Sequence, residues 1–135
     1  MATPQRAIFN GMGQNQWYVH LSRTEGADLN VIKSALNDLR AACAADEINL
    51  TLGFGPGLLP ELTDDVPEDF QAYQTVESDD GSGRQAKGTQ EELLLWLNHD
   101  DKDKVWKAQY EARSALEGHM AVARETPTFI YGDSW

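Results

Sequence analysis

Three histidines are the side chains best suited to acid–base chemistry or metal binding in this sequence. His20 lies in an alternating stretch, where a neutral imidazole could ligate a haem iron, but packing or interface contact on a sheet face is the favoured interpretation. His99 precedes Asp100 and Asp101, yet side chains on adjacent positions converge poorly on one divalent cation, so a role at a helix start is expected. His119 is expected as a cation near a helix C-terminus. None of the three is assigned a metal-binding role.

The other reactive side chains lack the neighbours that catalysis requires. Cys43 is the single cysteine, so it cannot form an intramolecular disulfide, and a place in the core is expected. Ser22 and Ser34 have no histidine and acid at triad-like spacing. The glycines of 53–57 suggest a phosphate loop only superficially, because no Lys-Ser/Thr follows them. The sequence therefore predicts no catalytic residue and no metal site, and it leaves cofactor-binding residues unknown.

Composition restricts the class of partner. The chain has 135 residues, 41% hydrophobic and 24% charged, and is expected to form one domain over 1–135. Its net charge of −11 argues against nucleic acid and against anionic membrane surfaces, which attract cations. No run approaches the length of a membrane span, and the first residues lack the apolar core of a signal peptide. A cytoplasmic protein is expected.

The first half of the chain predicts a strand, a helix and a second strand. Gln16–Ser22 alternates between apolar and polar positions and is expected to be a strand. Asp28 stands at an N-cap position before an amphipathic helix over Leu29–Ala45. Ile48–Phe54 alternates again and predicts a strand with one buried face. The apolar stripe of the helix consists of Leu29, Ile32, Leu36, Leu39 and Cys43.

The second half repeats this order. Five consecutive apolar residues predict a strand over Glu92–Asn98 that is covered on both faces. Asp100 or Asp101 is expected to cap the next helix, and a last strand is expected over Glu125–Gly132. The stripe of this helix consists of Val105, Ala108, Ala112, Leu116 and either His119 or Met120.

A long connection, residues 55–91, separates the two halves. It shows no sustained periodicity, and connections of this length are usually functional or mobile. A helical turn is expected at residues 58–62, and an exposed loop tip at residues 78–82. Residues 1–14 are expected to form an extended arm.

Two strand–helix–strand units in one sheet predict an α+β fold, the ferredoxin-like βαββαβ sandwich with a four-stranded antiparallel sheet and two helices on one face. The first and third strands are expected to be central and parallel to each other. Pro127 suits an edge strand, because proline has no N–H for the ladder. The second face of the sheet has no cover from this chain and is expected to meet another sheet or a partner. Its candidate residues are Tyr18, His20, Leu94, Trp96, Phe129 and Tyr131.

Three segments in this order carry a family resemblance: Leu50–Pro56, Gly88–Gln90, and the third strand running into Asn98–Asp101. Together they resemble the N-terminal half of the dye-decolorizing (DyP-type) haem peroxidases, over about residues 15 to 135. Each motif alone has low specificity, and the ordered set is moderately specific.

The resemblance implies a haem b oxidoreductase that oxidises dyes and phenolic compounds with hydrogen peroxide. In that family the C-terminal domain supplies the histidine ligand of the iron and a distal arginine. A distal aspartate lies in a Gly-x-x-Asp-Gly motif just after the fourth strand. Asp133 is neither preceded by Gly-x-x nor followed by glycine, so no catalytic role is carried over to it. The chain thus lacks the haem ligand and the distal catalytic residues of the family.

Two hypotheses follow. The chain is the N-terminal domain of a truncated or split peroxidase, and its partner is the missing C-terminal domain. Alternatively, it is a stand-alone module, of a binding, structural or small monooxygenase-like kind, whose open sheet face pairs with a second copy as in dimeric α+β barrels; a homo-oligomer is expected. Met12, Met120 and the tryptophans are interpreted as packing residues, although Trp96 and Tyr131 are candidates for electron transfer.

Overall fold

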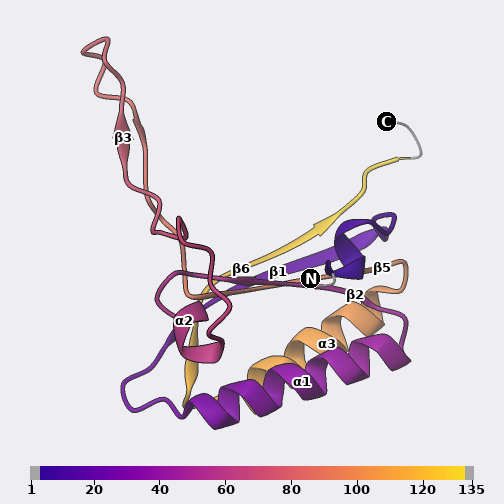
Figure 1. Ribbon diagram of the computed structural model, residues 1–135. Coiled ribbons are helices and arrows are strands. Elements are labelled where there is room, and N and C mark those ends of the chain that lie inside the picture. The colour runs from indigo at the N-terminus through magenta and orange to yellow at the C-terminus, as the bar shows by residue number, and fades with distance from the viewer. Residues whose placement is uncertain (1–3, 133–135) are drawn as a thin grey trace.

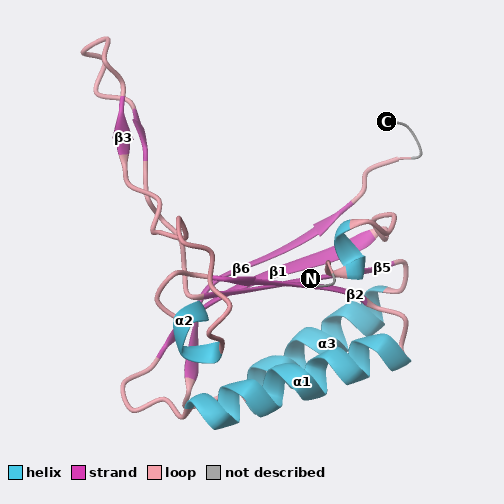
Figure 2. Ribbon diagram, viewed as in Figure 1, coloured by secondary structure: helices cyan, strands magenta, loops and turns pink. Residues whose placement is uncertain are grey.

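The computed structural model describes residues 4–132 (Figure 1). The chain forms a four-stranded sheet with two long helices on one face and a two-stranded ribbon that stands away from it (Figure 2). The elements are η1 (Arg6–Ile8), β1 (Asn15–Arg23), α1 (Leu29–Ala45), β2 (Asn49–Phe54), α2 (Leu59–Leu62), β3 (Val76–Glu77), β4 (Gln85–Ala86), β5 (Leu93–His99), α3 (Lys102–Ala115) and β6 (Met120–Phe129).

The sheet has the order β2-β5-β1-β6, and every neighbouring pair is antiparallel. The α+β ferredoxin-like sandwich is confirmed, with β1 and β5 in the centre. The prediction that these two central strands are parallel was wrong. Each helix crossover joins two strands that run in the same direction but are not neighbours, so β5 lies between β1 and β2, and β1 lies between β5 and β6.

Local signals fix both helices. Helix α1 spans Leu29–Ala45 as predicted, and the Asp28 carboxylate accepts a hydrogen bond from the Asn30 amide at 2.8 Å. Asp101 is the cap of α3, and its carboxylate accepts from the amides of the next turn. Both helices pack on one side of the sheet over a continuous apolar core (Figure 1). Its most deeply buried members are Val19, Leu21, Ile32, Leu58, Leu93, Leu95, Leu97, Val105 and Leu116.

The last strand begins earlier than predicted. Strand β6 covers Met120–Phe129 instead of Glu125–Gly132, because Gly118, with a φ of +80°, ends the α3 turn and reverses the chain at once. The pairing with β1 then skips Ala123, which forms a bulge. Pro127 lies on this edge strand, as predicted.

The long connection contains more structure than the sequence indicates. The helical turn at 58–62 is confirmed as α2. The following segment, residues 63–90, which we name the arm, rises from the sheet on the side opposite to α1 and α3 (Figure 1). Strands β3 and β4 pair near its end, and residues 79–90 are all exposed. The predicted loop tip at 78–82 closes this ribbon.

The N-terminal segment is not a free extended arm over the described residues 4–14. It forms the short helix η1, and the Gln5 side chain exchanges two hydrogen bonds with the Leu52 backbone, at 2.7 and 2.8 Å, along the edge of β2. At Gly13 the segment passes so close to His99 that a Cβ would lie 2.5 Å from the His99 backbone. Only glycine fits that crossing.

Candidate functional site

The candidate site is the sheet face that no helix covers, which we name the open face. Strand alternation and the pairing register place three layers of side chains on it. Tyr18 of β1 lies beside Trp96 of β5, and His20 lies beside Leu94. The full set from the four strands is Asn49, Thr51, Gly53, Leu94, Trp96, Asn98, Gln16, Tyr18, His20, Arg124, Thr126 and Thr128.

Two of the expected residues lie elsewhere. Phe129 pairs with Asn15, which alternates with Trp17 on the helix side, so Phe129 is not on the open face. Tyr131 follows the end of β6 and is 84% exposed. The sequence contains no signal for the register of an edge strand. Phe129 and Tyr131 were assigned to the open face because they are aromatic, and that criterion was wrong.

An aromatic cluster forms the centre of the open face. The rings of Tyr18 and Trp96 stack with centroids 5.5 Å apart and an interplanar angle of 17°. Both donate to one acceptor, the Gln16 Oε1, from the Tyr18 hydroxyl at 2.9 Å and from the Trp96 indole N–H at 3.2 Å. Burial raises the pKa of Tyr18. The polar edges of both rings are thus held, and the outer surface of the stacked pair remains for a contact.

The Thr51 hydroxyl lies next to this cluster, since Thr51 pairs with Trp96. It is buried and has no hydrogen-bond partner among residues 4–132. Buried hydroxyls without a partner are uncommon in folded proteins.

His20 lies at the arm end of the open face, against the Arg124 guanidinium. One guanidinium nitrogen is 3.4 Å from the Nδ1 and 3.5 Å from the Nε2 of the imidazole. Burial, together with the charge of Arg124, lowers the pKa of His20, while Glu91 acts in the opposite direction. The imidazole is therefore neutral at pH 7. Its recorded side-chain neighbour is the Arg124 guanidinium.

A hollow of about 470 Å³ lies where the open face meets the base of the arm. His20, Arg124 and Leu94 line its sheet side, and Phe70 and Tyr73 line its arm side. It is an open corner between two surfaces.

The remaining histidines have structural partners. His99 Nδ1 accepts from the Asp101 amide at 2.8 Å, which supports the predicted role at a helix start. His119 lies after the end of α3, where its Nδ1 accepts from the Asp28 amide at 3.0 Å. This hydrogen bond links the end of α3 to the residue that caps α1, and the charge expected on His119 stays a prediction. Within residues 4–132, no three His, Cys, Asp or Glu side chains gather as a metal site requires.

Of the other residues considered in the sequence, some lie where they were predicted and some do not. Cys43 is buried in the core, as predicted, and burial raises its pKa to about 12. Met120 packs in the core, but Met12 is 60% exposed and does not. Ser22 donates to the Glu91 carboxylate at 2.6 Å. Asp133, to which no catalytic role was assigned, lies outside the described residues. Among residues 4–132, no helix has the length and apolar character needed to cross a bilayer.

Sequence reasoning missed the polar members of the open face. Asn98 is 2% exposed, and its Oδ1 accepts from the Gly13 amide at 2.9 Å and from Asn49 at 3.0 Å. Gln16, at 8% exposed, is the shared acceptor of the aromatic cluster. Gln16 and Asn98 are each two residues from Tyr18 and Trp96 along their strands, so strand alternation places all four on the same face. That alternation was the signal in the sequence that could have identified them.

The open face does not complete a haem site. Haem iron needs an axial ligand with a free lone pair. His20 is the one histidine on this face, and the Arg124 guanidinium occupies the position beside both of its ring nitrogens. A metal cation at either nitrogen would meet that charge. The described residues therefore do not fit haem as its ligand set, although the flat aromatic cluster fits contact with a further domain.

Comparison with known proteins supports the fold. No protein-family model matches the sequence, and no curated protein matches it. A dye-decolorizing protein from V. cholerae is similar with a TM-score of 0.81 and 18% identity, over 96% of this chain and 45% of that chain. DyPB from Rhodococcus jostii RHA1 is similar with a TM-score of 0.77 and 17% identity, over 98% and 44%.

A dye-decolorizing peroxidase from Bacteroides thetaiotaomicron VPI-5482 is similar with a TM-score of 0.74 and 16% identity, over 92% of this chain and 42% of that chain. The chain thus spans less than half the length of these solved proteins. The resemblance to one half of the dye-decolorizing peroxidases is confirmed at the level of the fold: the chain has the ferredoxin-like fold that these peroxidases contain.

Proposed function

We propose that this chain is the N-terminal domain of a haem-dependent, dye-decolorizing-type peroxidase, an oxidoreductase that uses hydrogen peroxide to oxidise dyes and phenolic compounds. One observation carries the proposal: the fold match covers 96% of this chain but only 45% of its V. cholerae counterpart. The second half of such an enzyme would come from a second domain, on this polypeptide or on another.

In this proposal the open face receives that second domain. The Tyr18–Trp96 stack is an aromatic patch on this face, and the inner faces of packed sheets carry side chains of this kind. This chain supplies one wall of the haem pocket and no iron ligand. The relatives support the cofactor, because two solved variants of the R. jostii protein are complexes with heme.

The test compares this chain with a two-domain protein. The coding region after Trp135 and the adjacent genes should encode a Gly-x-x-Asp-Gly motif and a later histidine. Joined to that region and purified with haemin, the protein should show the Soret band of ligated haem and should oxidise an anthraquinone dye with peroxide. The chain alone should show neither.

A haemin titration of the chain alone tests whether the proposal is wrong. A strong Soret shift that His20→Ala abolishes, and that the control His99→Ala retains, would show that this chain carries its own iron ligand. The proposal would then be wrong.

The second candidate is a stand-alone module whose open face pairs with the open face of a second copy. The uncovered aromatic cluster favours it. Light scattering coupled to size exclusion separates the candidates. A haem-free dimer that Trp96→Glu dissociates supports this second candidate, and a dimer that survives Trp96→Glu excludes it.

A further inference from the structure

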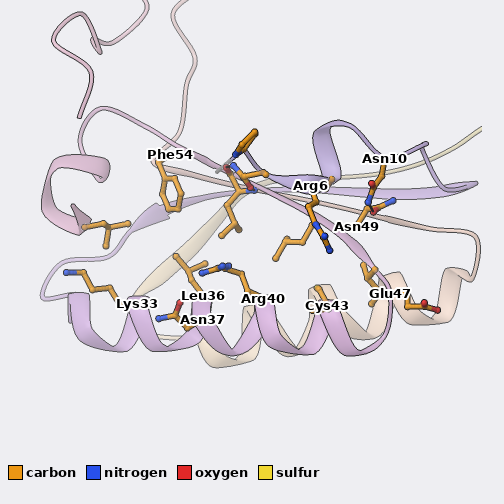
Figure 3. A pocket seen from close by; sticks show the side chains of 18 residues that line it. Arg6, Asn10, Lys33, Leu36, Asn37, Arg40, Cys43, Glu47, Asn49 and Phe54 are labelled. Carbon is orange, nitrogen blue, oxygen red and sulfur yellow. Dashed lines mark hydrogen bonds between the residues drawn. The ribbon is translucent and has the colours of Figure 1, made fainter. Parts of the chain in front are cut away.

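A groove of about 1100 Å³ lies between helix α1 and the edge strand β2, on the side of the sheet opposite to the open face (Figure 3). The N-terminal segment closes one of its sides. Its floor is apolar and includes Leu36 of α1 and Leu50, Leu52 and Phe54 of β2. The groove is therefore separate from the candidate site.

Positive charge lines this groove. Lys33 and Arg40 rise from α1, seven residues and two turns apart, and Arg6 reaches toward the helix from η1 (Figure 3). None of these three side chains forms a salt bridge or hydrogen bond with another residue in the range 4–132. Glu47 is the one carboxylate in the lining. In a chain with a net charge of −11, this is an unusual concentration of unpaired cations.

The arm is acidic, so its charge is complementary to the positive charge of the groove. Arg84 and Lys87 are its only cations, against seven carboxylates. Tyr73 and Val76 are 52% and 55% exposed, so the arm also presents apolar side chains to solvent. The seven carboxylates are those of Asp64, Asp65, Glu68, Asp69, Glu77, Asp79 and Asp80.

Beyond its base, the arm is held by contacts within itself. Strands β3 and β4 pair, and the Gly88 amide donates to Thr75 at 3.1 Å. At the tip, Asp80 accepts from the Ser82 amide at 2.9 Å and forms an ion pair with Arg84. Such internal pairing reduces the conformational entropy that the ribbon loses when it binds.

Length and direction decide which groove the arm can reach. Each leg of the paired ribbon, such as 73–80, spans about 26 Å at ~3.3 Å per residue. The α1 wall of the groove, from Lys33 to Ala44, is about 17 Å long at ~1.5 Å per residue. The arm is long enough to fill it, but it rises on the other side of its own sheet (Figure 1). Only the groove of another copy is accessible.

We propose that the arm of one copy lies in the α1–β2 groove of a second copy, with the arm carboxylates against Arg6, Lys33 and Arg40. If the exchange is reciprocal, two equal contacts form a closed, two-fold dimer. Charge complementarity specifies the pairing, and the exposed apolar side chains of the arm cover the groove floor. This contact does not depend on the proposed peroxidase function, because it leaves the open face free.

The test reverses the charge of the groove in one variant and of the arm in another, and measures the association of each full chain by sedimentation analysis. The unmodified chain should form a dimer that weakens as salt rises. The groove variant Lys33→Glu/Arg40→Glu and the arm variant Glu77→Lys/Asp79→Lys should each raise the dimer Kd about tenfold or more. Matched controls that alter charge elsewhere, Lys102→Glu/Lys107→Glu and Glu25→Lys/Glu117→Lys, should leave the Kd within about twofold.

Mixing the groove and arm variants should restore the dimer. The acidic arm of the groove variant then meets a basic groove. The arm of the arm variant, which carries two added cations near its tip, meets an acidic groove. A second experiment tests contact directly: Asp79→Cys and Asn37→Cys chains, mixed under mild oxidation, should form a disulfide-linked heterodimer. Cys43 does not interfere, since it is 1% exposed.

Three results would overturn the proposal: a chain that stays monomeric at low salt, a dimer that both charge-reversed variants retain, or a mixture of variants that fails to associate. A dimer that Trp96→Glu dissociates while the groove and arm variants keep it would assign the interface to the open face instead. Failure of the haemin and dye-oxidation experiments would leave the arm contact unaffected.

Discussion

Replacing Asn98 by alanine should release the N-terminal segment from the sheet and lower the free energy of unfolding by about 3–5 kcal/mol. The Asn98 side chain is almost fully buried, and its Oδ1 accepts from the Gly13 amide and from the Asn49 side chain. The variant loses both hydrogen bonds. It also leaves the amide of Gly13, a buried residue, without an acceptor.

The magnitude follows from these two effects. A hydrogen bond contributes about 1 kcal/mol net, so the two lost bonds account for about 2 kcal/mol. A buried donor without a partner costs about 1–3 kcal/mol more, and the upper part of that range applies only if water stays excluded. Gly13 passes tightly over the His99 backbone, which limits access for water.

Urea unfolding, followed by tryptophan fluorescence, measures the free energy of unfolding. Asn10→Ala is the matched control, because its side chain makes one exposed hydrogen bond, to Asn49 at 2.7 Å, and its loss should cost about 0.5 kcal/mol or less. Hydrogen exchange should show faster exchange of the Gly13 amide in Asn98→Ala alone. Equal stabilities for the two variants, with Gly13 exchange unchanged, would refute the reasoning.

Three further outcomes are expected. Asp101→Ala removes the cap of α3 and should cost about 1 kcal/mol in urea unfolding, whereas Lys102→Ala should cost much less. Cys43, whose pKa burial raises to about 12, should not react with an aromatic disulfide reagent until urea unfolds the chain; rapid reaction at pH 8 would contradict its burial. His20 should titrate below pH 6.5 in NMR spectra, and Arg124→Ala should raise its pKa. Because the folded-state pKa is lowered, His20 contributes stability that is present above pH 6.5 and is lost as the pH falls through the folded-state value.

Elements with a local cause were predictable from sequence. Helix α1 was correct at both ends, because the Asp28 cap and the apolar stripe are both local signals. Strand β5 was placed within one residue, because its apolar run is flanked by charges. The early start of β6 was missed, since the bulge at Ala123 interrupts the strand period.

Features that depend on tertiary pairing were not predictable. The ribbon of β3 and β4 has no apolar alternation, and each of its strands is two residues long. The roles of Gln16 and Asn98 depend on which strands lie side by side, because their partners are distant in sequence. The basic groove combines residues from η1, α1 and β2, and no single stretch of sequence shows that their charges meet.

Strand β6 has a practical consequence for handling this chain. It is a ten-residue strand at the end of the sheet, and residues 121–127 are all exposed. Such an edge is a template for pairing with other chains, and overexpressed protein at high concentration is prone to precipitate through it. Pro127 and the bulge at Ala123 oppose this, since one removes an N–H and the other twists the strand. Pro127→Val should therefore lower the solubility limit without changing the fold, which makes the proline a safeguard worth keeping in any engineered version.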